Sequence, residues 1–120
     1  MYQSKVIEIG PLVEEMAQEG GFVIVFNEGA PDALAEMAVL HTKCEVTQDL
    51  KAGDVVRFGD NVYTITAVGD EANHTFSTMG HCSFKFTGHP EVELPGQIEL
   101  DGCGVVPEIK AGDRFEIEYQ

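Results

Sequence analysis

Short runs of alternating or wholly apolar residues, interrupted by glycine or proline, recur along the whole chain. Alternation with a period of two is typical of a strand that buries one face, and a short apolar run is typical of a strand covered on both faces. The run Phe22–Phe26 is of the second kind, because every residue in it is apolar. A mainly β fold is therefore predicted, with candidate strands at residues 5–9, 22–26, 38–46, 55–58, 62–68, 81–86, 97–100 and 114–119.

A short internal repeat precedes two of these strands. Residues 50–54 read Leu-Lys-Ala-Gly-Asp, and residues 109–113 read Ile-Lys-Ala-Gly-Asp. Glycine in such turns supplies the positive φ that other residues resist, so the two copies indicate equivalent corners of a curved sheet. Closing the sheet also removes exposed strand edges. The predicted fold is a small closed or partly open barrel of about seven strands, drawn from these eight candidate segments, with one short helix.

That helix is expected directly after Pro31, because proline suits the first helical position and Asp32 favours the positive end of a helix. From Ala38 to Val46 the pattern changes to that of a half-buried strand. In this strand His41 and Lys43 would share the polar face, with His41 at its start.

The length and the charge limit what the chain does. Its 120 residues suit a single domain spanning residues 1–120. Seven basic residues against 21 acidic ones give a formal charge of −14, which disfavours nucleic acid and anionic lipid as partners and favours a basic protein. The N-terminal residues lack the apolar run of a signal peptide, so a cytoplasmic location is expected. Three cysteines without a C-x-x-C spacing favour reduced thiols.

The usual enzyme motifs are absent, including the P-loop, the glycine-rich dinucleotide fingerprint and the nucleophile elbow. No metal site or other cofactor is expected, since neighbouring residues of a strand, such as His81 and Cys82, point to opposite faces. The residue type left to carry chemistry is histidine, which occurs at positions 41, 74, 81 and 89.

The neighbourhood of His41 carries a family resemblance. The run Phe-Asn-Glu-Gly-Ala-Pro at residues 26–31, followed by His41, resembles the glucitol/sorbitol-specific IIA component of the bacterial phosphoenolpyruvate-dependent sugar phosphotransferase system. The likeness spans nearly the whole chain. It continues through residues 66–69, Gly80-His81 with Phe84 and Phe86, residues 94–96 and the strand after Gly112.

The resemblance implies a phosphocarrier. In this family a histidine accepts a phosphoryl group from phosphorylated HPr and passes it to the IIB component of the sugar permease, and His41 occupies the matching position. The IIB and IIC permease components are thus implied partners, and the carrier would visit the inner face of the membrane transiently. Neutral imidazole suits the role, because its lone pair attacks phosphorus at physiological pH and forms a readily transferred phosphoramidate. By analogy with other IIA proteins, Nε2 is the expected acceptor atom.

Three more residues are candidates for supporting roles. Lys43 would contact the phosphoryl group from the same strand face as His41, although a solvated surface lysine is the simpler interpretation. His81 would bind the phosphoryl group or orient His41, or else lie at the surface as a strand cap. Glu28 would orient an imidazole or bind main-chain N–H groups at the helix start. His74 and His89 are expected in solvated loops.

Two other classes of function stay open at this stage. A non-catalytic β-barrel module would bind a ligand and show the same composition, with His41 merely exposed. A regulatory domain would use His41, His81 and a cysteine as metal or ligand contacts. A homodimer is also open, because an unpaired strand such as Phe22–Phe26 would offer its edge to a second copy.

Overall fold

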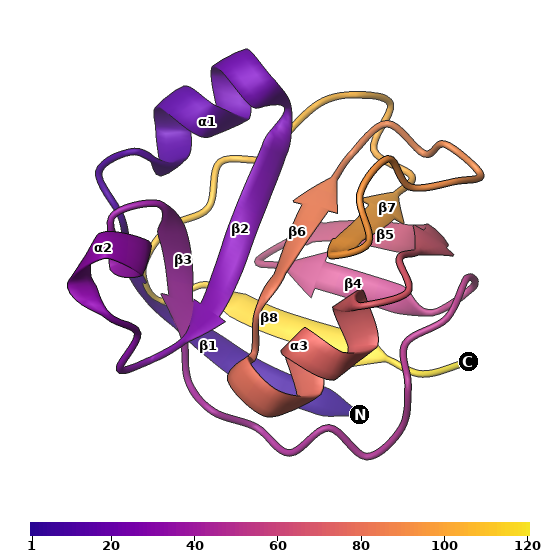
Figure 1. Cartoon of the computed structure of the whole chain (residues 1–120), viewed down its shortest axis with the longest axis horizontal. Coiled ribbons are helices and arrows are strands. Elements are labelled where there is room, and N and C mark those ends of the chain that lie inside the picture. Colours follow the sequence, from indigo (N-terminus) through magenta and orange to yellow (C-terminus); the bar gives the residue numbers. More distant parts are fainter.

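The computed structural model describes all residues from 1 to 120 and forms one closed β-barrel of eight strands (Figure 1). The barrel order is β1-β3-β2-β6-β7-β5-β4-β8, and β8 pairs with β1 to close the ring. The strands are β1 (Tyr2–Ile9), β2 (Phe22–Asn27), β3 (Ala38–His41), β4 (Val55–Phe58), β5 (Asn61–Val68), β6 (Cys82–Lys85), β7 (Gln97–Leu100) and β8 (Arg114–Glu118).

The three helices are α1 (Val13–Gly20), α2 (Asp32–Ala35) and α3 (Ala72–Met79). In Figure 1, α1 and α3 lie at opposite ends of the neighbouring strands β2 and β6. All three helices are too short to cross a bilayer. Pro31 takes the N-cap position of α2, one residue before the first helical turn, with an extended ψ of 146°.

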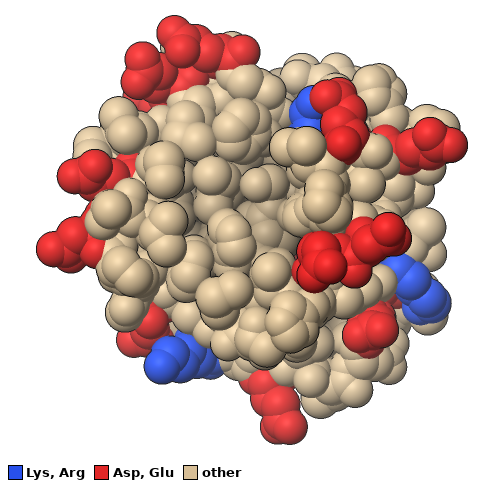
Figure 2. Space-filling view, viewed as in Figure 1, with Lys and Arg blue, Asp and Glu red and all other residues tan.

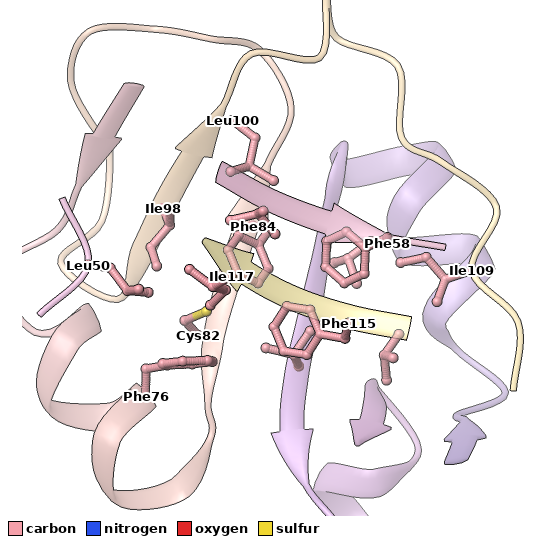
Figure 3. Packing of buried hydrophobic residues seen from close by; sticks show 14 of the residues in the cluster. Leu50, Phe58, Phe76, Cys82, Phe84, Ile98, Leu100, Ile109, Phe115 and Ile117 are labelled. Atoms are coloured by element: carbon pink, nitrogen blue, oxygen red, sulfur yellow. The ribbon is translucent and has the colours of Figure 1, made fainter. Parts of the chain in front are cut away.

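Aromatic rings from several strands fill the barrel (Figure 3). Phe58 of β4 stacks on Phe115 of β8 with ring centroids 4.9 Å apart, and Phe84 of β6 meets both rings edge-on. The alternation of β6 is confirmed, because Cys82, Phe84 and the following Phe86 are all buried. Burial of such large apolar side chains is the main stabilising contribution in a barrel of this size.

The barrel is built from two similar halves. Every ladder in one half has a counterpart in the other at a constant spacing of 59 residues, as from Gly10 to Gly69 or from Cys44 to Cys103. Val6 pairs with His41 as Ile65 pairs with Leu100, and both ladders contain an irregularity just after these pairs. The halves are β8-β1-β3-β2 and β4-β5-β7-β6, and they meet where β2 pairs with β6 and where β4 pairs with β8.

The short repeat recognised in the sequence belongs to this larger arrangement. Gly53 and Gly112 have φ values of 99° and 97°. In both turns an aspartate accepts a hydrogen bond from the main chain of a lysine, 2.9 Å from Lys51 N to Asp54 Oδ2 and 2.9 Å from Lys110 N to Asp113 Oδ2. The two turns are equivalent corners, because they lead into β4 and β8, which lie side by side.

The predicted fold class, a mainly β barrel with short helices, is confirmed, and several details differ. Eight strands form instead of about seven, and three helices instead of one. The candidate strands at residues 55–58 and 62–68 pair with each other as a β-hairpin. The predicted strand from Ala38 to Val46 ends at His41, and residues 42–46 are irregular. Phe22–Phe26 offers no free edge, because β2 pairs with β3 on one side and β6 on the other.

Candidate functional site

His41 is the last residue of β3 and is fully buried. Its neighbours across the ladders are Val6 of β1 and Asn27 of β2. The sequence pattern predicts His41 on a polar outer face, and that prediction is wrong. All four residues of β3 are buried, because segments distant in the sequence cover both of its faces.

Both ring nitrogens of His41 face main-chain carbonyl oxygens. Nε2 lies 2.9 Å from the carbonyl oxygen of Gly80, the residue that ends α3, and Nδ1 lies 3.1 Å from the carbonyl oxygen of Thr42. The hydroxyl oxygens of Ser4 and Tyr2 lie 3.2 and 3.4 Å from Nδ1. A neutral imidazole has one N–H, so it donates to one of the two carbonyls and not to both.

The groups around the ring allow two proton arrangements in the closed site. Ser4 Oγ donates to the Thr42 carbonyl at 2.7 Å, so its proton is already used. Burial raises the pKa of Tyr2, and its hydroxyl therefore keeps a proton that it can donate to Nδ1. With the proton on Nε2, the ring donates to the Gly80 carbonyl and Nδ1 accepts from Tyr2, although the Nδ1 lone pair also faces the Thr42 carbonyl oxygen. With the proton on Nδ1, the ring donates to the Thr42 carbonyl and the Nε2 lone pair faces the Gly80 carbonyl oxygen.

Burial lowers the pKa of His41 below its ordinary value of 6.5. The carbonyl oxygens of Gly80 and Thr42 and the charge of Glu28 act in the opposite direction, because they favour the imidazolium, but burial outweighs them. Phe115 presses its ring edge-on against the imidazole at a centroid distance of 4.9 Å, and Phe76 stacks at 6.4 Å. The site holds a neutral ring.

Asn27 is a site residue for which the sequence gives no chemical reason. Its side-chain Oδ1 is buried without a hydrogen-bond partner. A methyl group added at Gly80 would collide with the Asn27 amide and would lie 2.9 Å from His41 Cε1. The amide, the imidazole and the Gly80 turn are therefore packed directly against one another. A polar group buried without a partner is uncommon and needs an explanation.

The other predicted residues lie around this centre without joining it. Lys43 is exposed and does not share a strand face with His41, because the strand ends before it. Its main-chain N–H points to Glu28 Oε2 at 3.4 Å, and the main-chain N–H of Glu28 donates to the His41 carbonyl at 2.8 Å. Through these hydrogen bonds Glu28 links the C-terminal ends of β2 and β3.

His81 follows Gly80 and is half-buried. Its Nδ1 lies 3.1 Å from the Val25 carbonyl oxygen, and its ring packs on Phe26 with centroids 4.8 Å apart. No hydrogen bond joins the His41 and His81 rings. His81 instead fixes the chain on one side of the Gly80 carbonyl. His74 and His89 are exposed, and His74 lies on α3 instead of in a loop.

No cluster of three or more His, Cys, Asp or Glu side chains is placed to hold a metal ion. Cys82 points into the barrel, where burial raises the pKa of its thiol and so opposes the thiolate that a metal prefers. The arrangement in which His41, His81 and a cysteine act together as ligands is not present.

Comparison with known proteins agrees with this geometry. Residues 1–116 match the family model described as the PTS system glucitol/sorbitol-specific IIA component. The chain belongs to this family. Glucitol/sorbitol-specific EIIA components of Shigella flexneri and Escherichia coli (strain K12) are each 32% identical over 102 residues, covering 85% of this chain and 82% of theirs.

A solved structure supports the fold of this IIA-family chain independently. The crystal structure of a PTS system IIA component from Enterococcus faecalis V583 matches with a TM-score of 0.84 at 27% identity, over 98% of this chain and 99% of that one. The family resemblance predicted from the sequence is confirmed. As a glucitol/sorbitol-type IIA component, the chain is a phosphotransferase that takes part in sugar phosphotransfer.

The buried neutral ring predicts a specific pH dependence of stability. Because folding lowers the pKa of His41, the unfolded chain binds more protons than the folded one below pH 6.5. The stability contributed by the neutral ring is complete above pH 6.5 and is lost as the pH falls from there through the lower pKa of the folded state. The stability advantage of the parent protein over His41→Gln should therefore shrink as the pH falls. Urea unfolding of both proteins at a series of pH values measures it, with exposed His74→Gln as the control. An advantage that stays constant across pH 6.5 would contradict the buried neutral ring.

Replacing Gly80 with alanine is predicted to destabilise the protein. Its φ of 62° strains any other residue, and the added methyl group also collides with Asn27 and His41. We expect Gly80→Ala to lower the free energy of unfolding by about 2 kcal/mol or more. Gly21 is the matched control, because it ends α1 with a φ of 70° and has open space around it, so that Gly21→Ala adds only the backbone strain of about 1 kcal/mol. Equal losses in the two variants would show that Gly80 is not packed against the site.

Proposed function

We propose that the chain, acting as one IIA domain over residues 1–120, is a phosphocarrier. His41 accepts a phosphoryl group from phosphorylated HPr and passes it to the IIB component of a glucitol/sorbitol-type permease. The single observation that carries the proposal is the buried neutral imidazole whose Nε2 is covered by one main-chain carbonyl, that of Gly80. The protein then works in the cytoplasm and meets the permease at the inner face of the membrane.

Accepting a phosphoryl group requires the closed site to open. The Gly80 carbonyl has to leave Nε2, and the ring proton has to stand on Nδ1, where the Thr42 carbonyl at 3.1 Å accepts it. Nε2 then attacks phosphorus with its lone pair. As the N–P bond forms, the bond between phosphorus and the donor breaks, and its electron pair returns to the donor. The Thr42 carbonyl fixes the ring orientation during both transfers.

The groups around the ring suit a carrier that also has to release the phosphoryl group. With a proton on Nδ1, the phosphorylated imidazole is cationic and is a good leaving group. The Thr42 carbonyl and the charge of Glu28 both favour the cationic ring. Asn27 and Lys43 are the candidates for compensating charge on the phosphoryl oxygens. The Asn27 amide is already packed at the site, and Lys43 is the cation nearest to His41 in the sequence.

The surface charge supports a basic partner. Figure 2 shows mostly acidic side chains, with a few Lys and Arg side chains among them, around the edge of one face of the molecule and an uncharged area at its centre. In the same view of Figure 1, β2, β6 and α3 lie across this area. Burial alternates along β2: Val23 and Val25 are buried, whereas Phe22, Ile24 and Phe26 are half-buried. An uncharged centre with an acidic rim fits a partner with an apolar contact area and a basic rim.

Phosphorylation on His41 can be tested directly. After incubation with phosphoenolpyruvate, enzyme I and HPr, intact-protein mass spectrometry at neutral or alkaline pH should show one added phosphoryl group on the parent protein. His41→Ala should show none, while the exposed-site control His74→Ala should show the same gain as the parent. Asn27→Ala and Lys43→Ala should keep the acceptor and slow its labelling by roughly tenfold if they contact the phosphoryl oxygens.

Two outcomes would overturn the assignment. Labelling of His41→Ala at the parental rate would move the acceptor to another residue, with His81 the first to examine. No labelling of the parent, with HPr itself shown to be phosphorylated, would favour a binding module that does not carry phosphate.

The acidic rim predicts a salt dependence of the transfer rate. Long-range attraction between the acidic chain and a basic donor is screened over about 8 Å at physiological ionic strength and over shorter distances as salt is added. The second-order rate of labelling by phosphorylated HPr should fall by tenfold or more between about 20 mM and about 500 mM salt. Labelling by a small phosphoryl donor such as acetyl phosphate is the control for effects on the chemical step. A rate with HPr that does not depend on salt would remove the electrostatic argument.

A further inference from the structure

The structure contains a cavity away from His41. It is a cavity of about 550 Å³ between α1 and the segment 104–109, within the range of small-molecule sites. Its apolar lining consists of Ile9, Val13, Ala17, Val23, Val106 and Ile109. None of the residues that contact His41 lines it, and the proposed phosphocarrier function does not use it.

The equivalent helix of the other half carries a larger side chain. Ala17 of α1 corresponds to Phe76 of α3 at the spacing of 59 residues (from 17 to 76). Phe76 is buried and packs against Tyr2 at a centroid distance of 5.0 Å. Ala17 ends in a methyl group at the wall of the cavity. One half therefore supplies an aromatic ring from its own helix, whereas the other leaves space beside the helix.

A second difference between the halves concerns hydrogen bonds. In the half with α3, the side chain of Asn73 bonds both main-chain groups of Leu50. It accepts from the Leu50 N–H at 2.7 Å and donates to the Leu50 carbonyl at 3.0 Å. In the half with α1, the counterparts of Asn73 and Leu50 are Glu14 and Ile109. The main-chain N–H and C=O of Ile109 make no hydrogen bond within the chain, although the residue is only 9% exposed.

The charge at the cavity limits its occupant further. Glu14 and Glu108 both line the cavity and are exposed, and no lysine or arginine lines it. Lys110, outside the lining, has its Nζ 3.8 Å from Glu108 Oε1, so the two carboxylates together keep a net negative charge at the mouth. A cation at the mouth is attracted by both carboxylates, whereas an anion is repelled.

We propose that the cavity beside α1 binds a small molecule with three features: an aromatic ring, a carboxamide and an ammonium group. The ring occupies the apolar space beside Ala17. The carboxamide bonds the free N–H and C=O of Ile109, as Asn73 bonds Leu50. The ammonium group lies between Glu14 and Glu108. The cavity is thus a binding site separate from His41.

L-Phenylalaninamide carries all three groups and is the probe. Titration into the ¹⁵N-labelled full chain, followed by NMR, should give saturable shifts at the residues that line the cavity, with no comparable shifts at Asn27 or His41. L-Alaninamide lacks the ring, and L-phenylalanine replaces the carboxamide with a carboxylate, so both should bind at least about tenfold more weakly. Shifts that do not saturate, or equal binding of all three compounds, would overturn the proposal.

Variants of α1 test the geometry. Ala17→Phe supplies the ring that the other half has and should abolish probe binding and raise the melting temperature. Glu14→Gln should weaken binding by about threefold to fivefold, whereas Glu15→Gln, which removes the same charge from a residue outside the cavity, should leave it unchanged. If Ala17→Phe does not fold, Ala17→Leu takes its place. Parental affinity in a folded Ala17 variant would show that the probe binds elsewhere.

Discussion

The hydrogen-bonded pairing of β2 with β6 is the contact on which the rest of the structure depends. It joins the two halves of the barrel along one side, while β4 and β8 join them along the other. Neither half closes on itself, so each would expose two unpaired strand edges without its counterpart. The pairing also fixes the site. Because Val25 lies opposite Cys82, the turn at Gly80 falls beside the end of β2, where its carbonyl reaches His41. A slip of one residue would turn every side chain of β6 to the other face and remove this contact.

The burial of His41 has an energetic reason as well as a chemical one. A neutral imidazole is tolerated in an aromatic environment when its nitrogens have partners, and here main-chain and hydroxyl groups supply them. The same surroundings keep water from the ring. In the proposed mechanism, a closed resting state and an open reactive state differ mainly by the position of the turn at Gly80. Gly80 suits this turn, because it has no side chain to obstruct the ring or the Asn27 amide.

Much of the fold could be predicted from the sequence, because strands that bury one face show a period of two. Phe84 and Ile117 were identifiable as core residues for this reason. The burial of His41 could not be predicted, because the residues that cover it are far away in the sequence. Ser4 contributes a hydroxyl group and Gly80 a main-chain carbonyl, and neither residue type indicates such a contact. The segment after His41 has the composition of a strand and lies beside β1, but most of its bonds to β1 involve side chains, so no regular main-chain ladder forms. Helix α3 is rich in Ser and Thr, which are weak helix formers, so its helical state depends on packing through Phe76.

The two similar halves of the barrel also determine where the chain has to be covalently continuous. Tyr2 of β1 lies opposite Ile117 of β8, just as Asn61 of β5 lies opposite Phe58 of β4, and a tight turn through Gly59 and Asp60 makes the second connection. Tyr2 and Ile117 occupy the same two positions of the 59-residue repeat as Asn61 and Phe58, but no turn connects them. A circular permutant that joins the ends through a Gly-Asp turn and is cut in the irregular segment after His41 would contain the same elements in the same cyclic order. In such a protein the strand that carries His41 would become the last element of the chain, and the barrel would be unchanged.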